Sequence, residues 1–319
     1  MMKLKFFLNV TTAGILLLFA SAGFCQSTIS MNEWVEKVGQ GSVNWTAGYI
    51  EAVGIGAPPD QSAGRINARP MALRAAKVDA YRNLLEITKG VQVDSKTLVR
   101  DYTVESDVIN TQVEGLVKGA YVVDQQYMSD GTVEVKLRMP LYGNLSGIVV
   151  PLVVEKQKED VPPAAPAPAP AAEAQPEAPS PATAPAPPAA TPAAPAVPAP
   201  APASSPVLYT GLVVDARGIQ ARPAMSPRIF DEDGKEVYGS ANVEREYAVS
   251  QGMSGYARDL TAAQSNQRVT ANPVTVKALK TGGPGKADLV ISNADAKVIT
   301  ESAQNASFMK QCRVMIVLD

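Results

Sequence analysis

The chain has 319 residues, in which 29 Lys and Arg stand against 31 Asp and Glu, and it contains no histidine. Imidazole titrates nearest neutral pH and is the commonest transition-metal ligand, so its absence excludes Ser/His/Asp and Cys/His catalysis and ordinary zinc sites. The sequence has no basic block of the kind that neutralises phosphates, which argues against a nucleic-acid partner.

The first 25 residues have the order of a secretory signal peptide. Lys3 and Lys5 come first, an apolar run follows over residues 6–19, and small residues occupy positions 20–23. This order predicts export, with residues 1–25 as the signal peptide. The alternative, a retained transmembrane anchor, fits less well because the run is shorter than the roughly 20 residues that span a bilayer.

The chain has two cysteines, which bear on lipid anchoring to a membrane and on disulfide formation. Cys25 stands where a lipoprotein cysteine would be acylated, but Phe24 replaces the small residue that precedes such a cysteine. Cleavage after Ala22 or after Cys25 fits a soluble exported product better. Cys312 has no dependable partner and lies in an apolar run, so we expect a buried small hydrophobe and no disulfide framework.

A first domain is predicted over residues 26–160. Ser30 and Glu33 have the spacing of a capping box, which predicts a short helix over residues 34–38. A strand is predicted over residues 49–56, where larger apolar residues alternate with smaller ones.

A long helix is predicted over residues 68–89. Its apolar residues form one stripe at spacings of three and four: Leu73, Ala76, Ala80, Leu84 and Ile87. The small alanines at its centre predict close packing on a sheet. A partner-binding helix is the alternative to this core position.

A β-hairpin is predicted over residues 117–141, turning at Ser129-Asp130-Gly131. In its second strand, apolar residues alternate strictly with others, which predicts one buried and one solvated face. The alternating apolar residues are Val133, Val135, Leu137, Met139 and Leu141.

Residues 161–206 are almost wholly alanine and proline. Proline fixes φ and donates no backbone hydrogen bond, so this stretch can neither join a sheet nor bury a core. We expect a disordered, extended linker. It either sets the reach between two domains or connects them passively.

A second domain is predicted over residues 207–319. Its expected elements are strands near 212–215, 289–292 and 313–318, a hairpin turning at 231–234 and a helix over about 294–304. The whole pattern predicts an α+β fold of two small domains, each a mostly antiparallel sheet with packed helices, joined by the Pro/Ala-rich linker.

Two glycine motifs imitate phosphate-binding loops. The segment 54–56 lacks the third glycine of a dinucleotide fingerprint because Pro59 stands there, so a strand-exit turn is expected. Gly285-Lys286 has Lys280 at the position of the first glycine and Ala287 at that of the Ser/Thr. Neither motif predicts a cofactor site.

The acidic segment 231–234 copies part of a calcium loop. Ile229 replaces the first ligand and Ser240 replaces the bidentate glutamate, so an acidic turn is expected. Paired carboxylates can hydrolyse glycosides without histidine, but no spacing singles out a pair. The sequence therefore predicts no catalytic, cofactor-binding or metal-binding residue, and no cofactor.

Three segments of the first domain carry a family resemblance. Residues 48–56, the Ala-rich helix 68–85 and the hairpin segment 130–135 resemble the LPP family of small envelope lipoproteins. They are also similar to the N-terminal portion of FlgT-type flagellar assembly proteins, over roughly residues 45–150. Three segments of the last domain are similar to a C-terminal part of some members: 211–218, 228–239 and 312–317.

The resemblance implies an exported envelope protein and, in some relatives, a part in flagellar assembly. We therefore expect a non-catalytic protein of the periplasm or outer membrane with a structural or binding role. Its expected partners are envelope or surface-appendage proteins, and peripheral membrane association stays open. The alternative is a secreted carboxylate-dependent hydrolase.

Overall fold

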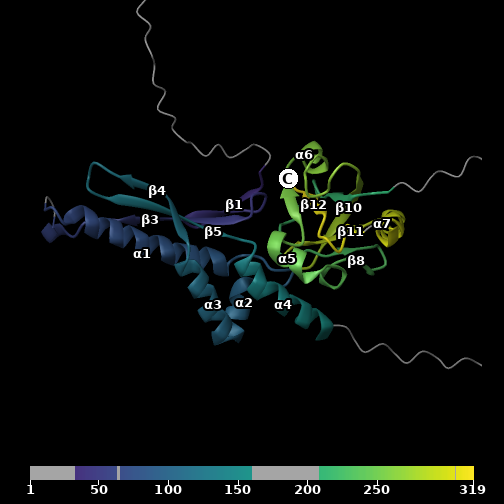
Figure 1. Ribbon diagram of the computed structural model, residues 1–319, viewed down its shortest axis with the longest axis horizontal. Coiled ribbons are helices and arrows are strands. Elements are labelled where there is room, and N and C mark those ends of the chain that lie inside the picture. The colour runs from purple at the N-terminus through teal and green to yellow at the C-terminus, as the bar shows by residue number, and fades with distance from the viewer. Residues whose placement is uncertain (1–32, 63–64, 160–207, 306) are drawn as a thin grey trace, which may run out of the picture. The chain divides into compact units, whose positions relative to one another are not determined.

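The computed structural model describes residues 33–62, 65–159, 208–305 and 307–319, and contacts join these described residues in one compact unit. The described residues have the predicted α+β architecture, with two sheets and packed helices (Figure 1). The predicted signal peptide, 1–25, and the predicted linker, 161–206, lie outside the described residues.

The first sheet has five strands in the order β1-β2-β3-β5-β4, and every pairing in it is antiparallel. The strands are β1 (Val35–Val38), β2 (Gly41–Asn44), β3 (Tyr49–Gly56), β4 (Tyr121–Tyr127) and β5 (Val133–Pro140). The predicted strand over 49–56 and the predicted hairpin are confirmed, and the alternating apolar residues of β5 are buried. The first sheet is thus antiparallel, as expected.

The predicted helix over residues 34–38 is wrong, because residues 35–38 form β1 and Trp34 precedes it. Gly39 adopts φ +51° between β1 and β2, and this left-handed conformation closes a tight hairpin. Glu33 does not cap a helix; its carboxylate accepts a hydrogen bond from the Asn44 side chain at 2.7 Å. The hydrogen bonds between β1 and β2 therefore determine the structure of these residues, and the expected capping box does not.

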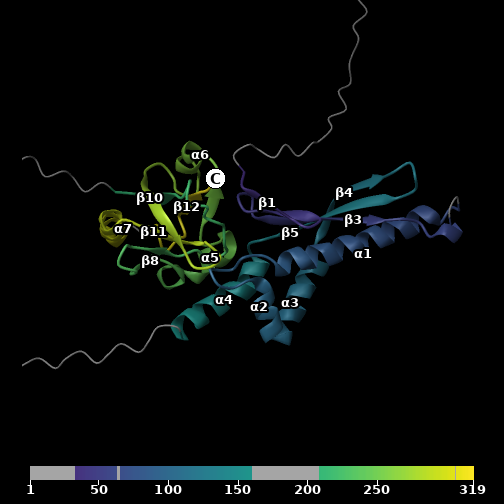
Figure 2. The same ribbon diagram turned by 180° about the vertical axis from the view of Figure 1, so that it is seen from behind.

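Helix α1 (Ala68–Lys89) confirms the long predicted helix and runs along one face of the first sheet (Figures 1 and 2). Its fully buried row follows nearly every fourth residue: Ala68, Ala72, Ala76, Ala80, Leu84, Ile87 and Thr88. Leu73, expected in the stripe, is half-buried, and Ala72 lies in the core instead. The remaining helices of this part are α2 (Val99–Glu105), α3 (Asp107–Lys118) and α4 (Asn144–Glu159), with a 3-10 turn at Asp60–Ser62.

Gly54 and Gly56 explain why alanines form that row. They lie inside β3 rather than in the expected exit turn, and a Cβ on either would collide with α1. A Cβ on Gly56 would lie 2.9 Å from the Cβ of Ala75. Glycine in the strand and alanine in the helix together allow the helix backbone to approach the sheet closely.

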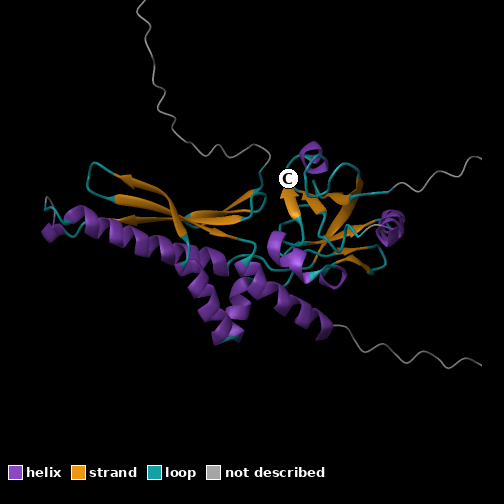
Figure 3. Ribbon diagram, in the orientation of Figure 1, coloured by secondary structure: helices purple, strands orange, loops and turns teal. Residues whose placement is uncertain are grey.

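The second sheet has seven strands in the order β8-β7-β11-β10-β6-β12-β9. Figure 3 draws the strands in orange and the helices that pack around them in purple. Its strands are β6 (Gly211–Asp215), β7 (Ile229–Phe230), β8 (Glu236–Tyr238), β9 (Gly255–Ala257), β10 (Pro273–Gly282), β11 (Asp288–Ile291) and β12 (Val314–Val317). The expected β7–β8 hairpin and the expected strands β6, β11 and β12 are confirmed.

The mostly antiparallel character expected for this second sheet is wrong. The β6–β10, β6–β12, β9–β12 and β7–β11 pairings are parallel, and the β10–β11 and β7–β8 pairings are antiparallel. The continuous apolar runs of β6 and β12 are buried on both faces, as parallel strands require. The helices here are α5 (Arg245–Gln251), α6 (Leu260–Gln264) and α7 (Asn293–Asn305), with a 3-10 turn at Ser240–Asn242.

Side chains and backbone groups join the two sheet-bearing parts within the compact unit. The Trp45 and Tyr256 rings pack edge to face, with 5.7 Å between their centroids. The Thr46 hydroxyl donates a hydrogen bond to the Tyr256 carbonyl at 2.7 Å. The Ser95 hydroxyl accepts the Asp288 backbone N–H at 2.7 Å. The predicted domain boundaries themselves fall in the undescribed segment and stay a prediction.

Candidate binding surfaces

The acidic turn 231–234 is engaged in local structure. An Asp231 carboxylate oxygen accepts the Lys235 backbone N–H at 2.8 Å, and an Asp233 oxygen accepts the Asn293 side-chain amide at 3.1 Å. Lys286, of the second glycine motif, donates to the Gln220 side chain at 2.8 Å. Among the described residues, no group of three or more Cys, Asp or Glu could hold a metal ion.

A cavity of about 800 Å³ lies between α7 and the β7–β8 hairpin. Its rim mixes three lysines with five carboxylates: Lys235, Lys297, Lys310, Asp231, Asp233, Glu236, Glu244 and Glu301. Asp231 and Asp233 already accept hydrogen bonds from the protein. The cavity therefore presents charges of both signs.

Glu236 is the unusual member of this rim. Burial raises the pKa of its carboxyl, and nearby Asp288 adds to the rise while Arg228 opposes it. Arg228 is itself committed to Asp288, with its Nη2 2.7 Å from Oδ2. These surroundings favour the neutral form of the carboxyl relative to an exposed glutamate, and no sequence motif had pointed to this residue.

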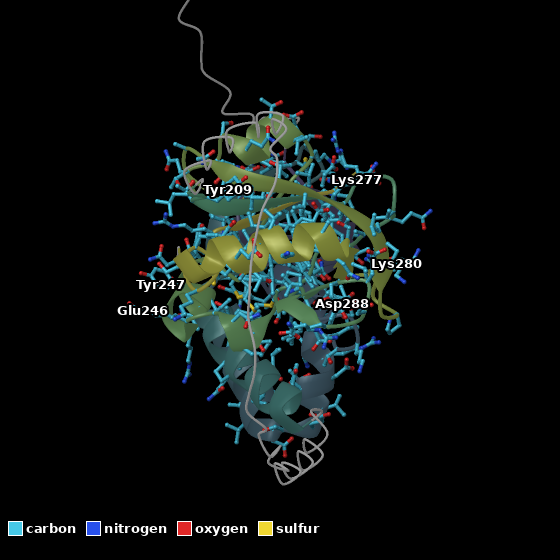
Figure 4. The ribbon with its side chains drawn as sticks, turned by 90° about the vertical axis from the view of Figure 1, so that its right-hand side faces the viewer. Tyr209, Glu246, Tyr247, Lys277, Lys280 and Asp288 are labelled. Carbon is cyan, nitrogen blue, oxygen red and sulfur yellow. The ribbon has the colours of Figure 1, made fainter. Side chains whose placement is uncertain are left out.

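Other polar side chains of the second sheet and its helices lie far apart. In Figure 4, Lys277 and Lys280 of β10 lie on one side of this part of the molecule. Glu246 and Tyr247 of α5 lie on the opposite side. These groups do not share a site.

Strand β4 is the most exposed strand that the structure describes. It ends the first sheet, and six of its seven residues are exposed. Large apolar side chains are among them, including Tyr121 (52%), Val122 (41%), Val123 (37%) and Tyr127 (50%). The terminal strands of the second sheet, β8 and β9, are by contrast mostly buried.

The backbone of β4 is irregular near its middle. The register with β5 shifts between Val122 and Asp124, which marks a β-bulge. The Asp124 carboxylate accepts the Gln125 backbone N–H at 2.8 Å, so one backbone donor is occupied locally. On the side away from β5, no strand that the structure describes pairs with β4. The sequence predicted this strand but not its exposure.

No described helix is both long enough and apolar enough to cross a membrane. No curated protein matches the chain. Residues 211–319, which contain the second sheet, are similar to the family described as Treponema pallidum Tp0624, second domain.

Proposed function

We propose that the chain is a non-catalytic, exported protein of a bacterial envelope with a binding role. The observation that carries this proposal is β4, an edge strand whose apolar side chains contribute little to the core of the protein itself. An exposed apolar edge strand is a ready template for pairing with another chain. Addition of an extended partner segment would pair with the remaining unpaired backbone groups of β4 and cover its apolar side chains.

The partner is an envelope or surface-appendage protein. The resemblance of the first domain to LPP lipoproteins and FlgT-type proteins supports this choice, with flagellar assembly as the more specific form. The exported location rests on the order of charges and apolar residues at the N-terminus.

The binding role is tested by photocrosslinking in the native envelope, with a photoreactive amino acid in place of Tyr121. We expect a discrete adduct that disappears when Val123→Lys places a charge on the edge. The matched control is Val298→Lys, which charges a similarly exposed valine of α7 and should leave the adduct intact. No adduct at Tyr121, or equal loss in both variants, rejects β4 as the binding edge.

Export is tested by N-terminal sequencing of the protein from its native host. The mature chain should begin between Gly23 and Ser27. Recovery of the protein with Met1 intact in the cytoplasm would remove the basis for an envelope role.

A carboxylate-dependent hydrolase is the second candidate, because Glu236 combines a raised pKa with a place on the rim of a large cavity. A protonated glutamate is the general acid that glycoside hydrolysis uses. Assay of the full chain on a panel of chromogenic glycosides tests it. Activity that Glu236→Gln abolishes and Glu246→Gln spares would replace the binding proposal.

A further inference from the structure

A groove beside α1 lies toward the edge of the first sheet that is opposite to β4. It has a volume of about 520 Å³ and follows α1 past the end of β3. Its apolar lining comes from Ala57, Pro59, Met71, Ala75 and Val78. Met71 and Val78 are 42% and 55% exposed, which leaves much of this lining open to solvent.

The groove exists because β2 is shorter than β3. Strand β2 pairs with residues 49–52 of β3, and no described strand pairs with residues 53–56 on that side. Side chains of α1 occupy this edge instead. The Asn83 side chain donates to the Val53 carbonyl at 2.8 Å, and the Asp79 carboxylate accepts the Ile55 N–H at 3.0 Å.

These two hydrogen bonds decide what kind of segment fits. An extended peptide gains affinity by pairing with free backbone groups of an edge, and here the Val53 carbonyl and the Ile55 N–H are already bound. An α-helix satisfies its own backbone and needs only a surface for its side chains. The positions Met71, Ala75 and Val78, spaced by four and three, form a ridge suited to helix packing.

The charged side chains of the groove determine which charges the bound helix should carry. Arg74 and Arg82 line it, and neither forms an ion pair with any residue that the structure describes. Asp79 is the one carboxylate among the described residues that line the groove; it accepts the Ile55 N–H and lies 3.4 Å from the Asn83 amide nitrogen. An apolar lining flanked by two free guanidinium groups is complementary to apolar side chains flanked by carboxylates.

We propose that this groove binds an acidic amphipathic α-helix of a partner protein. Its apolar face would cover Met71, Ala75 and Val78, and its carboxylates would pair with Arg74 and Arg82. This surface is separate from β4, so one chain can hold two segments at once.

The test uses the full chain and a fluorescent peptide of about 18 residues, with leucines on one helical face and glutamates on the other. Fluorescence anisotropy should show saturable binding with a Kd below about 1 mM. Arg74→Glu with Arg82→Glu should weaken binding about tenfold, because the change replaces two exposed ion pairs with repulsion between like charges. Val78→Ser should weaken it without any charge change.

The control variant carries Arg245→Glu with Arg258→Glu, two exposed arginines of the other part of the chain, and should bind as the wild type does. A second control, Val123→Lys on β4, separates this site from the proposed edge and should also bind normally. A peptide with lysine in place of glutamate should not bind.

Three results would overturn the proposal. They are absence of binding by the acidic peptide, equal weakening by both double variants, and Arg74- and Arg82-dependent sedimentation with phosphatidylglycerol vesicles in place of peptide binding. The last outcome would assign the groove to a membrane surface.

Discussion

Gly54 of β3 lies so close to Ala80 of α1 that a Cβ added to Gly54 would be 2.6 Å from the Ala80 Cα. The contact is between backbones, so no side-chain rotation can relieve it. The close approach of helix and sheet therefore depends on the absence of one carbon atom.

Gly54→Ala should destabilise the protein by about 1–3 kcal/mol, because an added methylene group in a tightly packed core forces the backbone apart. The matched control is Gly115→Ala on the exposed side of α3, where a Cβ meets nothing within 4 Å. That change should stabilise the protein by about 0.5–1 kcal/mol through helix propensity. Chemical denaturation measures both, and similar effects at the two sites would contradict the packing argument.

Leu84→Ala should cost about 2–5 kcal/mol, because Leu84 is fully buried in the core that also contains Val135 and Leu137. Arg82→Ala, on the exposed side of the same helix, should cost under about 0.5 kcal/mol. Urea titration of the two variants against the wild type is sufficient. Equally small effects would mean that the buried row of α1 does not hold the core together.

Ser95→Ala should cost about 1–3 kcal/mol, because it leaves the buried Asp288 N–H without its acceptor. Ser265→Ala serves as the control. It removes an exposed hydroxyl that donates to the Thr261 carbonyl at 2.8 Å, and it should stay within about 0.5 kcal/mol of the wild type. Thermal and chemical unfolding should rank the two variants in the same order.

Separated halves, ending near Gln157 and beginning near Val207, should each melt cooperatively, because each part carries its own sheet. Both should melt several degrees below the full chain, since separation exposes Trp45 and Tyr256 to water. Calorimetry of each half and of the full chain gives the comparison. A half without a cooperative transition would show that the predicted boundary is wrong.

Glu236→Gln should stabilise the protein near pH 7 and have little effect near about pH 3. Burial raises the pKa of Glu236 in the folded state above its unfolded value. The carboxyl therefore favours folding below the unfolded pKa and loses that contribution as the pH rises through the folded pKa. Unfolding free energies between about pH 3 and 7 check this, with Glu246→Gln to control for net charge. If the gain in unfolding free energy of Glu236→Gln over the wild type became larger toward low pH, the prediction would be wrong.

Local patterns in the sequence were sufficient for much of the fold. The strict alternation of β5 and the alanine row of α1 follow from side-chain geometry within one element, and both are confirmed. The strand β1 was missed because Gly39 permits a hairpin that outcompetes a helix. Which residues of an element are covered depends on its neighbours, as the half-buried Leu73 shows.

The sequence patterns could not predict which strands pair when they are far apart in the chain. Strand β10 pairs in parallel with β6, although Val274 and its partner Leu212 are far apart in the chain. The binding surfaces were missed for the same reason. The exposure of Val123 depends on the place of β4 at the edge of the sheet, and that of Val78 on where β2 ends relative to β3. No local pattern records either relationship.

The buried thiol of Cys312 can report how often the folded structure opens locally. The side chain is fully enclosed, and burial raises its pKa to about 11, so the folded protein presents almost no reactive thiolate. Alkylation at this position must then wait for the structure to open. The rate of labelling at Cys312, followed by peptide mass spectrometry, would count those openings without any engineered probe.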